Sequence, residues 1–290
     1  MNASLIKELR DISGAGMMDC KKALEENGND IKKATEWLRE KGIAKAAKKA
    51  GRIAAEGLST VITEGNKAVI LEINCETDFV AKNEKIQKFV NDVATTILNS
   101  NAKTMEDALA LSCEEGTLND YVTNMTATIG EKISFRRFAL VEKSDEEHFG
   151  AYIHMGGKIS VLTILNGANE AVAKDVSMHA AAMRPEYVTK EQVPAEQVEK
   201  EKKILTEQAI AEGKPANIAE KMVMGRISKY YKEICLEEQE FVKDNSVSVA
   251  KYVSNNGGKI VDVIRFEVGE GLEKRQDNFA EEVAAQMKGE

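Results

Sequence analysis

One pattern occurs twice in this chain and limits its fold more than any other feature: two β-rich segments around a short turn, followed by a helix. The four β-rich segments are 57–64, 67–74, 150–155 and 158–166. Gly65-Asn66 and Gly156-Gly157 separate the two members of each pair, which is typical of a β-hairpin. Helices are expected over 86–98 and 171–183, directly after each hairpin. The repeat predicts an α+β fold whose core has two related halves, each a small antiparallel sheet with helices on one face.

Further segments complete the two halves. A helix is expected over 108–129 and a strand over 133–142, between the two hairpin units. Near the end of the chain, a helix over 247–253 precedes a strand over 259–268. The first of these strands falls in the first core half and the second in the second core half.

The first 54 residues predict a separate module of three short helices. The apolar positions expected to face inward are Leu5, Ile6 and Leu9 in the first helix, Met18, Ala23 and Leu24 in the second, and Ile31, Ala34, Trp37 and Leu38 in the third. Asn27-Gly28-Asn29 ends the second helix, since Gly and Asn tolerate positive φ, and Asn29 or Asp30 can cap the third. So small a bundle buries little surface, and we expect it to serve as a binding attachment.

A basic stretch over 41–52 follows this module. Its cations are Lys41, Lys45, Lys48, Lys49 and Arg52, with no acidic residue between them. The stretch is either a solvated, Ala-rich helix or linker, or a cationic contact for an acidic partner. The alternative function for the chain is therefore a nucleic-acid-binding protein that uses the N-terminal helices and this stretch. The formal net charge of -8 argues against direct nucleic-acid binding, which needs a basic surface.

Residues 195–235 predict an antiparallel helical hairpin, because Gly213-Lys214-Pro215 separates two apolar helical stripes. A hairpin buries little against itself, so we expect a contact surface for a partner or for a second copy in a homodimer. A last amphipathic helix is expected within 273–290. The predicted domains are a three-helix module at 1–54, a first core half at 55–143, a second core half at 144–194 and 236–272, the hairpin at 195–235 and a C-terminal helical module at 273–290.

Composition points to a reducing compartment. The four cysteines, Cys20, Cys75, Cys113 and Cys235, are far apart and form no CxxC pair, which is typical of reduced thiols. No apolar run approaches the roughly 20 residues of a membrane span. The N-terminus is predicted to form an amphipathic helix rather than a signal or transit peptide. We expect a cytoplasmic, bacterial protein that has no contact with a membrane.

The sequence contains no convincing catalytic constellation. His148, His154 and His179 form neither an HExxH motif nor an HxH pair. Gly14-Ala15-Gly16 lacks the third glycine and the strand that a dinucleotide-binding turn requires, and the phosphate-binding GxxxxGK[ST] and the nucleophile elbow GxSxG do not occur. We expect no enzyme activity, no bound metal and no cofactor. A small-molecule enzyme built on the α+β core is the rival interpretation.

The segment 74–83 stands out because it lies between a strand and a helix and carries an aromatic residue. Phe79 there has only Val80 as an apolar neighbour. In one interpretation, Asp78 caps the following helix and Phe79 packs beneath that helix as a hydrophobic staple. In the other, a protruding loop presents the acid and the aromatic ring to a partner, since aromatic side chains often anchor interfaces.

Five motifs, in order along the chain, carry a family resemblance. They are GAGMMDCKKAL at 14–24 (preceded by KELR at 7–10), AAKKAG at 46–51, NCETDFV at 74–80, IAEKMV at 218–223 and IRFEVGEG at 264–271. Through them, essentially the whole chain resembles the elongation factor Ts family, the exchange factors for the translational GTPase elongation factor Tu. Residues 102–128 match the family poorly, so no function is assigned to them.

The resemblance implies an architecture and a function. The N-terminal module would be similar to ubiquitin-associated (UBA-like) domains, and the inserted hairpin would be a coiled coil. The chain would bind elongation factor Tu–GDP and promote GDP release during translation elongation. Thr77, Asp78, Phe79 and Val80 would disturb the magnesium site of the GTPase. The N-terminal module would touch the nucleotide-binding domain of the partner, and the second core half would hold a different partner domain.

Met17 and Met18 form a second, less specific pair of candidate contacts. Flexible Met side chains suit adaptable interfaces, and we expect one of the two to pack in the bundle and the other to be exposed. The competing interpretation places both in the core. A ubiquitin-type adaptor would use this module alone and would leave most of the chain without a role.

Overall fold

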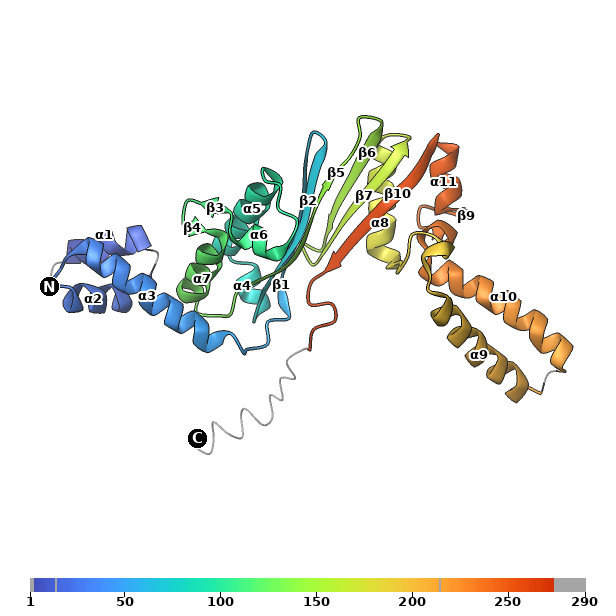
Figure 1. Ribbon diagram of the computed structural model, residues 1–290, viewed down its shortest axis with the longest axis horizontal. Coiled ribbons are helices and arrows are strands. Elements are labelled where there is room, and N and C mark those ends of the chain that lie inside the picture. Colours follow the sequence, from blue (N-terminus) through green and yellow to red (C-terminus); the bar gives the residue numbers. More distant parts are fainter. Residues whose placement is uncertain (1–2, 14, 214, 274–290) are drawn as a thin grey trace. The chain divides into compact units, whose positions relative to one another are not determined.

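A computed structural model describes residues 3–13, 15–213 and 215–273, without the side chains of residues 216, 217, 219 and 220 (Figure 1). The predicted α+β class is confirmed, because helices alternate with small sheets. The chain forms two compact units. Unit 1 is Met1–Thr60, Leu71–Leu140 and Phe266–Glu290, and unit 2 is Val61–Ile70 and Val141–Arg265. The finer division into five domains stays a prediction.

The N-terminal module has the three predicted helices. They are α1 (Ala3–Ser13), α2 (Met17–Glu26) and α3 (Ile31–Lys49). Gly28 and Asn29 adopt the positive φ expected of a helix stop, and the Asp30 side chain accepts a hydrogen bond from the Lys33 amide at 3.1 Å. The predicted third stripe is also found, with Ala34 buried and Trp37 packed against the small core.

The inward face of α2 differs from the prediction. Met18 is exposed, and Cys20 is buried with Ala23 and Leu24 instead. Residues 20, 23 and 24 have the i, i+3, i+4 spacing of one helical face, whereas position 18 falls on the opposite side. The prediction that Met18 faces the core is therefore wrong.

The basic stretch is mostly helical, because α3 continues to Lys49. Four of its five cations contact groups of unit 1 itself. The contacts are Lys41 above the Trp37 ring, Lys45 with Asp19 at 2.9 Å, Lys49 with the Gly130 carbonyl, and Arg52 with Glu76 at 3.3 Å. These contacts favour the interpretation as a solvated helix.

The first hairpin and the helix after it are confirmed. The strands β1 (Glu56–Glu64), β2 (Lys67–Cys75) and β5 (Ser134–Glu142) form a sheet in the order β1-β2-β5. Helix α5 (Glu84–Leu98) buries one apolar face, which includes Phe89 and Val93. The ring of Phe89 meets Tyr121 edge-on at 4.6 Å between centroids, which joins α5 to the helix before β5.

The single helix predicted over 108–129 is wrong. The segment instead contains α6 (Met105–Leu109), a small hairpin of β3 (Ser112–Cys113) and β4 (Gly116–Thr117), and α7 (Leu118–Ile129). Thr104 with Asp107 and Thr117 with Asp120 form capping boxes that start two helices separately. Gly116, at φ 107°, permits the turn between them.

Unit 2 contains the second hairpin and its sheet. The strands β6 (Glu147–His154), β7 (Ile159–Gly167) and β10 (Gly258–Glu267) lie in the order β10-β7-β6. The predicted two-residue turn is wrong, because the last pair in the β6–β7 register is His154 with Ile159. Met155, Gly156 and Gly157 all have positive φ, which produces a four-residue turn.

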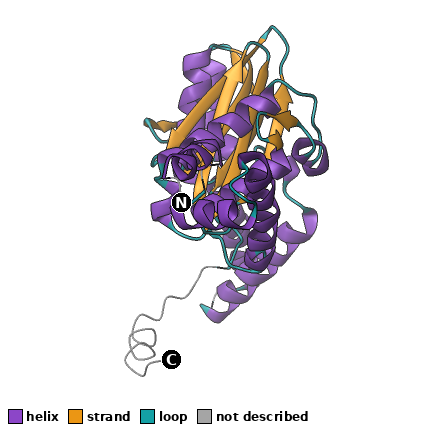
Figure 2. Cartoon of the chain, turned by 90° about the vertical axis from the view of Figure 1, so that its left-hand side faces the viewer, coloured by secondary structure: helices purple, strands orange, loops and turns teal. Residues whose placement is uncertain are grey.

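Figure 2 colours helices purple and strands orange. Helices and a short ribbon pack against this sheet through one apolar core. They are α8 (Glu170–Met183), α11 (Val249–Asn255), β8 (Glu240–Phe241) and β9 (Asp244–Ser248). The Phe241 ring stacks on Tyr252 at 4.1 Å within a core that includes Val161, Val176 and Val249. The predicted helix over 247–253 begins two residues later than expected, because Ser248 ends β9 and caps α11.

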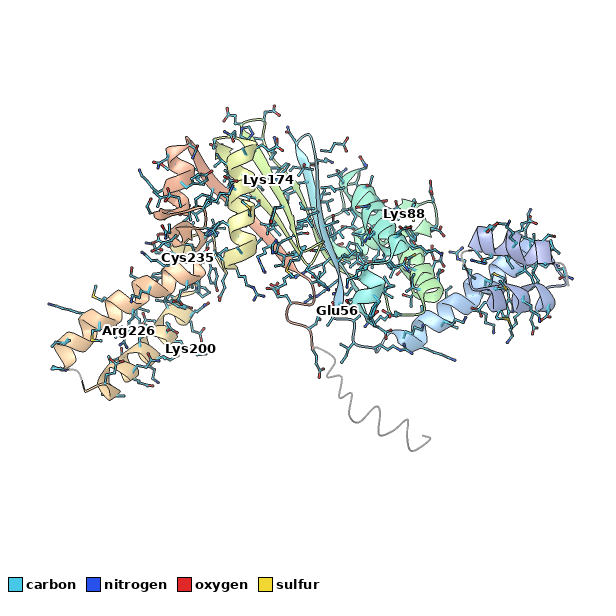
Figure 3. The ribbon with its side chains drawn as sticks, turned by 180° about the vertical axis from the view of Figure 1, so that it is seen from behind. Glu56, Lys88, Lys174, Lys200, Arg226 and Cys235 are labelled. Atoms are coloured by element: carbon cyan, nitrogen blue, oxygen red, sulfur yellow. The ribbon has the colours of Figure 1, made fainter. Side chains whose placement is uncertain are left out.

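The helical hairpin is confirmed. Its arms are α9 (Ala195–Ala211) and α10 (Ala216–Ile234), and short 3₁₀ turns, η1 (Lys190–Gln192) and η2 (Leu236–Glu238), flank it. Near the tip, Arg226 contacts both carboxylate oxygens of Glu212 at 2.9 and 3.0 Å. At the base, Gln197 bonds the Tyr187 and Tyr230 hydroxyls, each at 2.7 Å. Figure 3 marks Lys200 and Arg226 on the two arms.

The end of the described chain returns to unit 1. Gly269 and Gly271 have positive φ and follow the end of β10. The helix predicted within 273–290 lies outside the described residues, apart from Glu273. The four cysteines, all within the described part, form no disulfide. Among the described helices, none combines the length and apolar character needed to cross a membrane.

Candidate functional site

The segment after β2 forms a capped helical turn that presents an aromatic side chain. Helix α4 (Asp78–Ala81) is a single turn, and the Thr77 hydroxyl caps it by accepting a hydrogen bond from the Val80 amide at 3.3 Å. Phe79 is 80% exposed. We call residues 77–80 the Phe79 turn.

The staple interpretation of this segment is wrong. Phe79 points to solvent rather than beneath α5, and Asp78 does not cap that helix. Asn83 is the cap of α5, with its side chain accepting from the Lys85 amide at 2.9 Å. Because Thr77 and Asn83 occupy the two cap positions, a separate short helix forms between them and turns Phe79 outward.

The exposed face of the turn has an ordered set of charges beside the ring. The Asp78 carboxylate forms an ion pair at 2.7 Å with the Lys82 ammonium, which lies one helical turn later. The Lys82 ammonium also lies 6.0 Å from the centroid of the Phe79 ring. In α4, Ala81 is fully buried and anchors the turn, Asp78 and Val80 are half-buried, and Phe79 is exposed. A large apolar side chain in this position is exposed at a cost unless a partner covers it.

Sequence reasoning missed a residue that supports this turn. Glu131, which follows α7, accepts hydrogen bonds from the amides of Glu76 and Thr77 at 3.1 and 3.0 Å. Its second carboxylate oxygen accepts from the Thr77 hydroxyl at 2.8 Å. The contact joins positions more than fifty residues apart, and no local pattern around Glu131 indicates it.

The two methionines are both on the surface. Met17 is 59% and Met18 72% exposed, at the start of α2. The expectation that one packs in the bundle is therefore wrong, and so is the interpretation that both are core. Ile12, at the end of α1, is also exposed. The N-terminal module thus has apolar side chains that its own core does not use.

The titratable groups that looked like candidates for chemistry serve the structure. His179 is buried, accepts from the Val242 amide at 3.1 Å and lies 2.9 Å from the Gln239 side-chain oxygen, and burial lowers its pKa. His154 lies 3.1 Å from the Tyr152 hydroxyl. In the described part of the chain, no three His, Cys, Asp or Glu side chains gather as a metal site would require.

A family model described as Elongation factor TS matches residues 76–270. This chain belongs to the elongation factor Ts family. The match covers more than half of the chain and includes the Phe79 turn, Glu131 and the helical hairpin, whereas the N-terminal module lies before it. Membership makes the chain an exchange factor for elongation factor Tu in translation elongation. Proteins of the elongation factor Ts family promote nucleotide exchange rather than catalyse a chemical reaction.

Proposed function

We propose that this chain binds elongation factor Tu–GDP and uses the Phe79 turn to disturb the magnesium and nucleotide site of that GTPase. The observation that carries the proposal is the 80% exposure of Phe79 on a capped, ion-paired turn. An aromatic ring held outward in this way suits insertion into an apolar pocket of a partner.

Insertion would act on the magnesium ion indirectly. Mg²⁺ requires a near-octahedral shell of oxygen ligands, so a small displacement of those ligands loosens the ion. The nucleotide phosphates then lose the largest positive charge beside them. Asp78, held toward Lys82, would support the inserted ring through polar contacts.

The energetics require more than one side chain. Binding of the exchange factor and binding of GDP must oppose one another by the same coupling free energy, because linkage is reciprocal. A mutual weakening of about 10⁴-fold corresponds to about 5.5 kcal/mol. Burying one Phe side chain contributes about 1.5–3 kcal/mol. The N-terminal module and the second core half would therefore bind further surfaces of the GTPase.

We predict that Phe79→Ala slows factor-stimulated release of a fluorescent GDP analogue from elongation factor Tu by about tenfold, as expected for loss of 1.4 kcal/mol or more. Because Phe79 is exposed, the melting temperature should not fall. Glu114→Ala is the control, since it removes an exposed side chain in residues 102–128, to which no function is assigned. Stopped-flow release at wild-type rate with Phe79→Ala would refute the role of the ring.

We also propose that Met17 and Met18 contact the nucleotide-binding domain of the GTPase. Their exposure at the start of α2 supports this. The double variant Met17→Ala/Met18→Ala should weaken binding to nucleotide-free elongation factor Tu by about tenfold, with little change in stability. Titration calorimetry measures the affinity, and an affinity equal to that of the wild type would remove both residues from the interface.

A further inference from the structure

The Phe79 turn is held in place mainly from outside its own sequence. Within α4, Ala81 is the buried side chain, and it offers little apolar area to fix the turn. Three hydrogen bonds that orient the turn come from Glu131. Its carboxylate receives the amides of Glu76 and Thr77 and the hydroxyl of Thr77, at 3.1, 3.0 and 2.8 Å.

Glu76 makes a second contact between segments 76–77 and 131–132, in which the carboxylate comes from the first segment and the amide from the second. Its carboxylate accepts from the Lys132 amide at 2.6 Å and from the Arg52 guanidinium at 3.3 Å. The Lys132 ammonium completes the loop by donating to the Arg52 carbonyl at 3.0 Å. The segments 76–77 and 131–132 therefore each donate backbone amides to a carboxylate of the other.

Glu131 also determines what the Thr77 hydroxyl can do. That hydroxyl donates its one proton to Glu131 and accepts a hydrogen bond from the Val80 amide. Because the hydroxyl proton of Thr77 points to the Glu131 carboxylate, a lone pair of the hydroxyl oxygen faces the Val80 amide. This amide is the one that the N-cap residue of α4 has to satisfy. Glu131 thus fixes the rotamer of the capping residue, and the cap fixes the single helical turn that carries Phe79.

We propose that Glu131 is a positioning residue for nucleotide exchange, which holds the Phe79 turn in its binding geometry before the GTPase arrives. A turn ordered in advance avoids the loss of conformational entropy that would otherwise accompany insertion of the ring. The inference rests on the proposed function of Phe79. Glu131 acts only through Thr77 and α4.

The first measurement needs no partner. Amide hydrogen exchange of Thr77 and Val80, followed by NMR in the full chain, reports the order of the turn. Glu131→Ala should speed exchange of both amides about tenfold or more, because two hydrogen bonds to the segment and the cap geometry are lost. Glu131→Gln should stay near the wild type, since its amide oxygen can accept from the backbone and its NH₂ can donate to the Thr77 hydroxyl. Glu114→Ala, at an exposed carboxylate, is the control.

The second measurement is the GDP-release titration with elongation factor Tu. Glu131→Ala should lower the maximal release rate about three- to tenfold and leave the half-saturating concentration nearly unchanged, because the rest of the interface is intact. Glu131→Gln should restore release to within about twofold of the wild type. In the Phe79→Ala background, Glu131→Ala should have no further effect, since it acts through the same ring.

Three results would overturn the positioning role: wild-type amide exchange in Glu131→Ala, wild-type release by that variant, or an undiminished further loss of release in the Phe79→Ala background. Failure of the proposed function is a distinct result, because it would show as wild-type release by Phe79→Ala alone. The amide exchange of Thr77 and Val80 would then still decide whether Glu131 orders the turn.

Discussion

At the scale of single residues, Glu72 in unit 1 is a buried carboxylate with several charged and polar partners. This carboxylate on β2 is fully buried, and a buried charge is tolerated only with close partners. Arg136 and Arg137 lie at 3.0 and 2.6 Å, and the Asn74 amide and the Gly269 backbone donate at 2.9 and 2.8 Å. Burial works to raise the pKa of Glu72, but these hydrogen bonds outweigh it and hold the pKa below its ordinary value.

This shift predicts a pH-dependent contribution to stability. Because the folded pKa of Glu72 is lower than the unfolded value of 4.5, its contribution is complete above that value and is lost as the pH falls through the folded pKa. Glu72→Gln should lower the free energy of unfolding by about 2–3 kcal/mol at pH 7, less than for a fully buried pair because both guanidinium groups are about a quarter exposed.

Urea unfolding of both proteins at pH 7 and pH 3 checks this prediction. The difference between wild type and Glu72→Gln should shrink at the lower pH, because pH 3 lies below the unfolded pKa of 4.5 and the unfolded wild-type chain takes up a proton at Glu72. Glu114→Gln, at an exposed carboxylate, should show almost no difference at either pH. A Glu72→Gln difference that is the same at both pH values would contradict the assignment.

At the scale of elements, the packing of β6 against α8 depends on the absence of one side chain. A Cβ atom at Gly150 would lie 2.1 Å from the carbonyl carbon of Ala173. The close approach also allows the Ser177 hydroxyl to donate to the Gly150 carbonyl at 2.8 Å. The strand and the helix are therefore held together by both contact and hydrogen bonding.

Two glycine-to-alanine substitutions should have opposite effects. Gly150→Ala forces the helix away from the strand and should destabilise the protein by about 1–3 kcal/mol. Gly225→Ala, in α10, meets no atom within 4 Å and should stabilise it by up to about 1 kcal/mol through helix propensity. Thermal unfolding measures both, and stabilisation by Gly150→Ala would contradict the packing argument.

Some helices and strands can be predicted from the sequence and others cannot. Hairpins and amphipathic helices have periodic patterns, so β1 with β2, α5, α8 and the α9–α10 hairpin are found near their predicted bounds. Residues 108–129 were mispredicted because two capping boxes and a glycine turn outweigh a continuous helical pattern. Local capping chemistry, rather than hydrophobic spacing, decides that segment.

The candidate site was predictable only in part, and for a similar reason. Thr77, Asp78 and Asn83 are all residues that can cap a helix, so sequence alone leaves open which of them does and where Phe79 points. The support from Glu131 depends on a contact across the fold, which no local pattern contains. The resemblance pointed to residues 77–80, and the geometry explains how they are presented.

At the scale of the whole molecule, charge bears on the alternative function. The chain has a net charge of -8, and four of the five cations of the basic stretch over 41–52 are turned toward Asp19, Glu76, the Trp37 ring and the Gly130 carbonyl. A protein that binds nucleic acid through phosphates needs cations that are available to displace counterions. Both observations disfavour nucleic-acid binding through the N-terminal helices.

The last hydrogen bond of Glu72 can form only late during synthesis on the ribosome. Its arginine partners follow within the next 65 residues, but the Gly269 amide lies 197 residues later in the chain. At 5–20 residues per second, about 10–40 s pass between the appearance of the two groups. The nascent protein must therefore carry this strand through the synthesis of 197 further residues with one hydrogen bond of the carboxylate still unmade, and unit 1 is completed only after unit 2 has been synthesised.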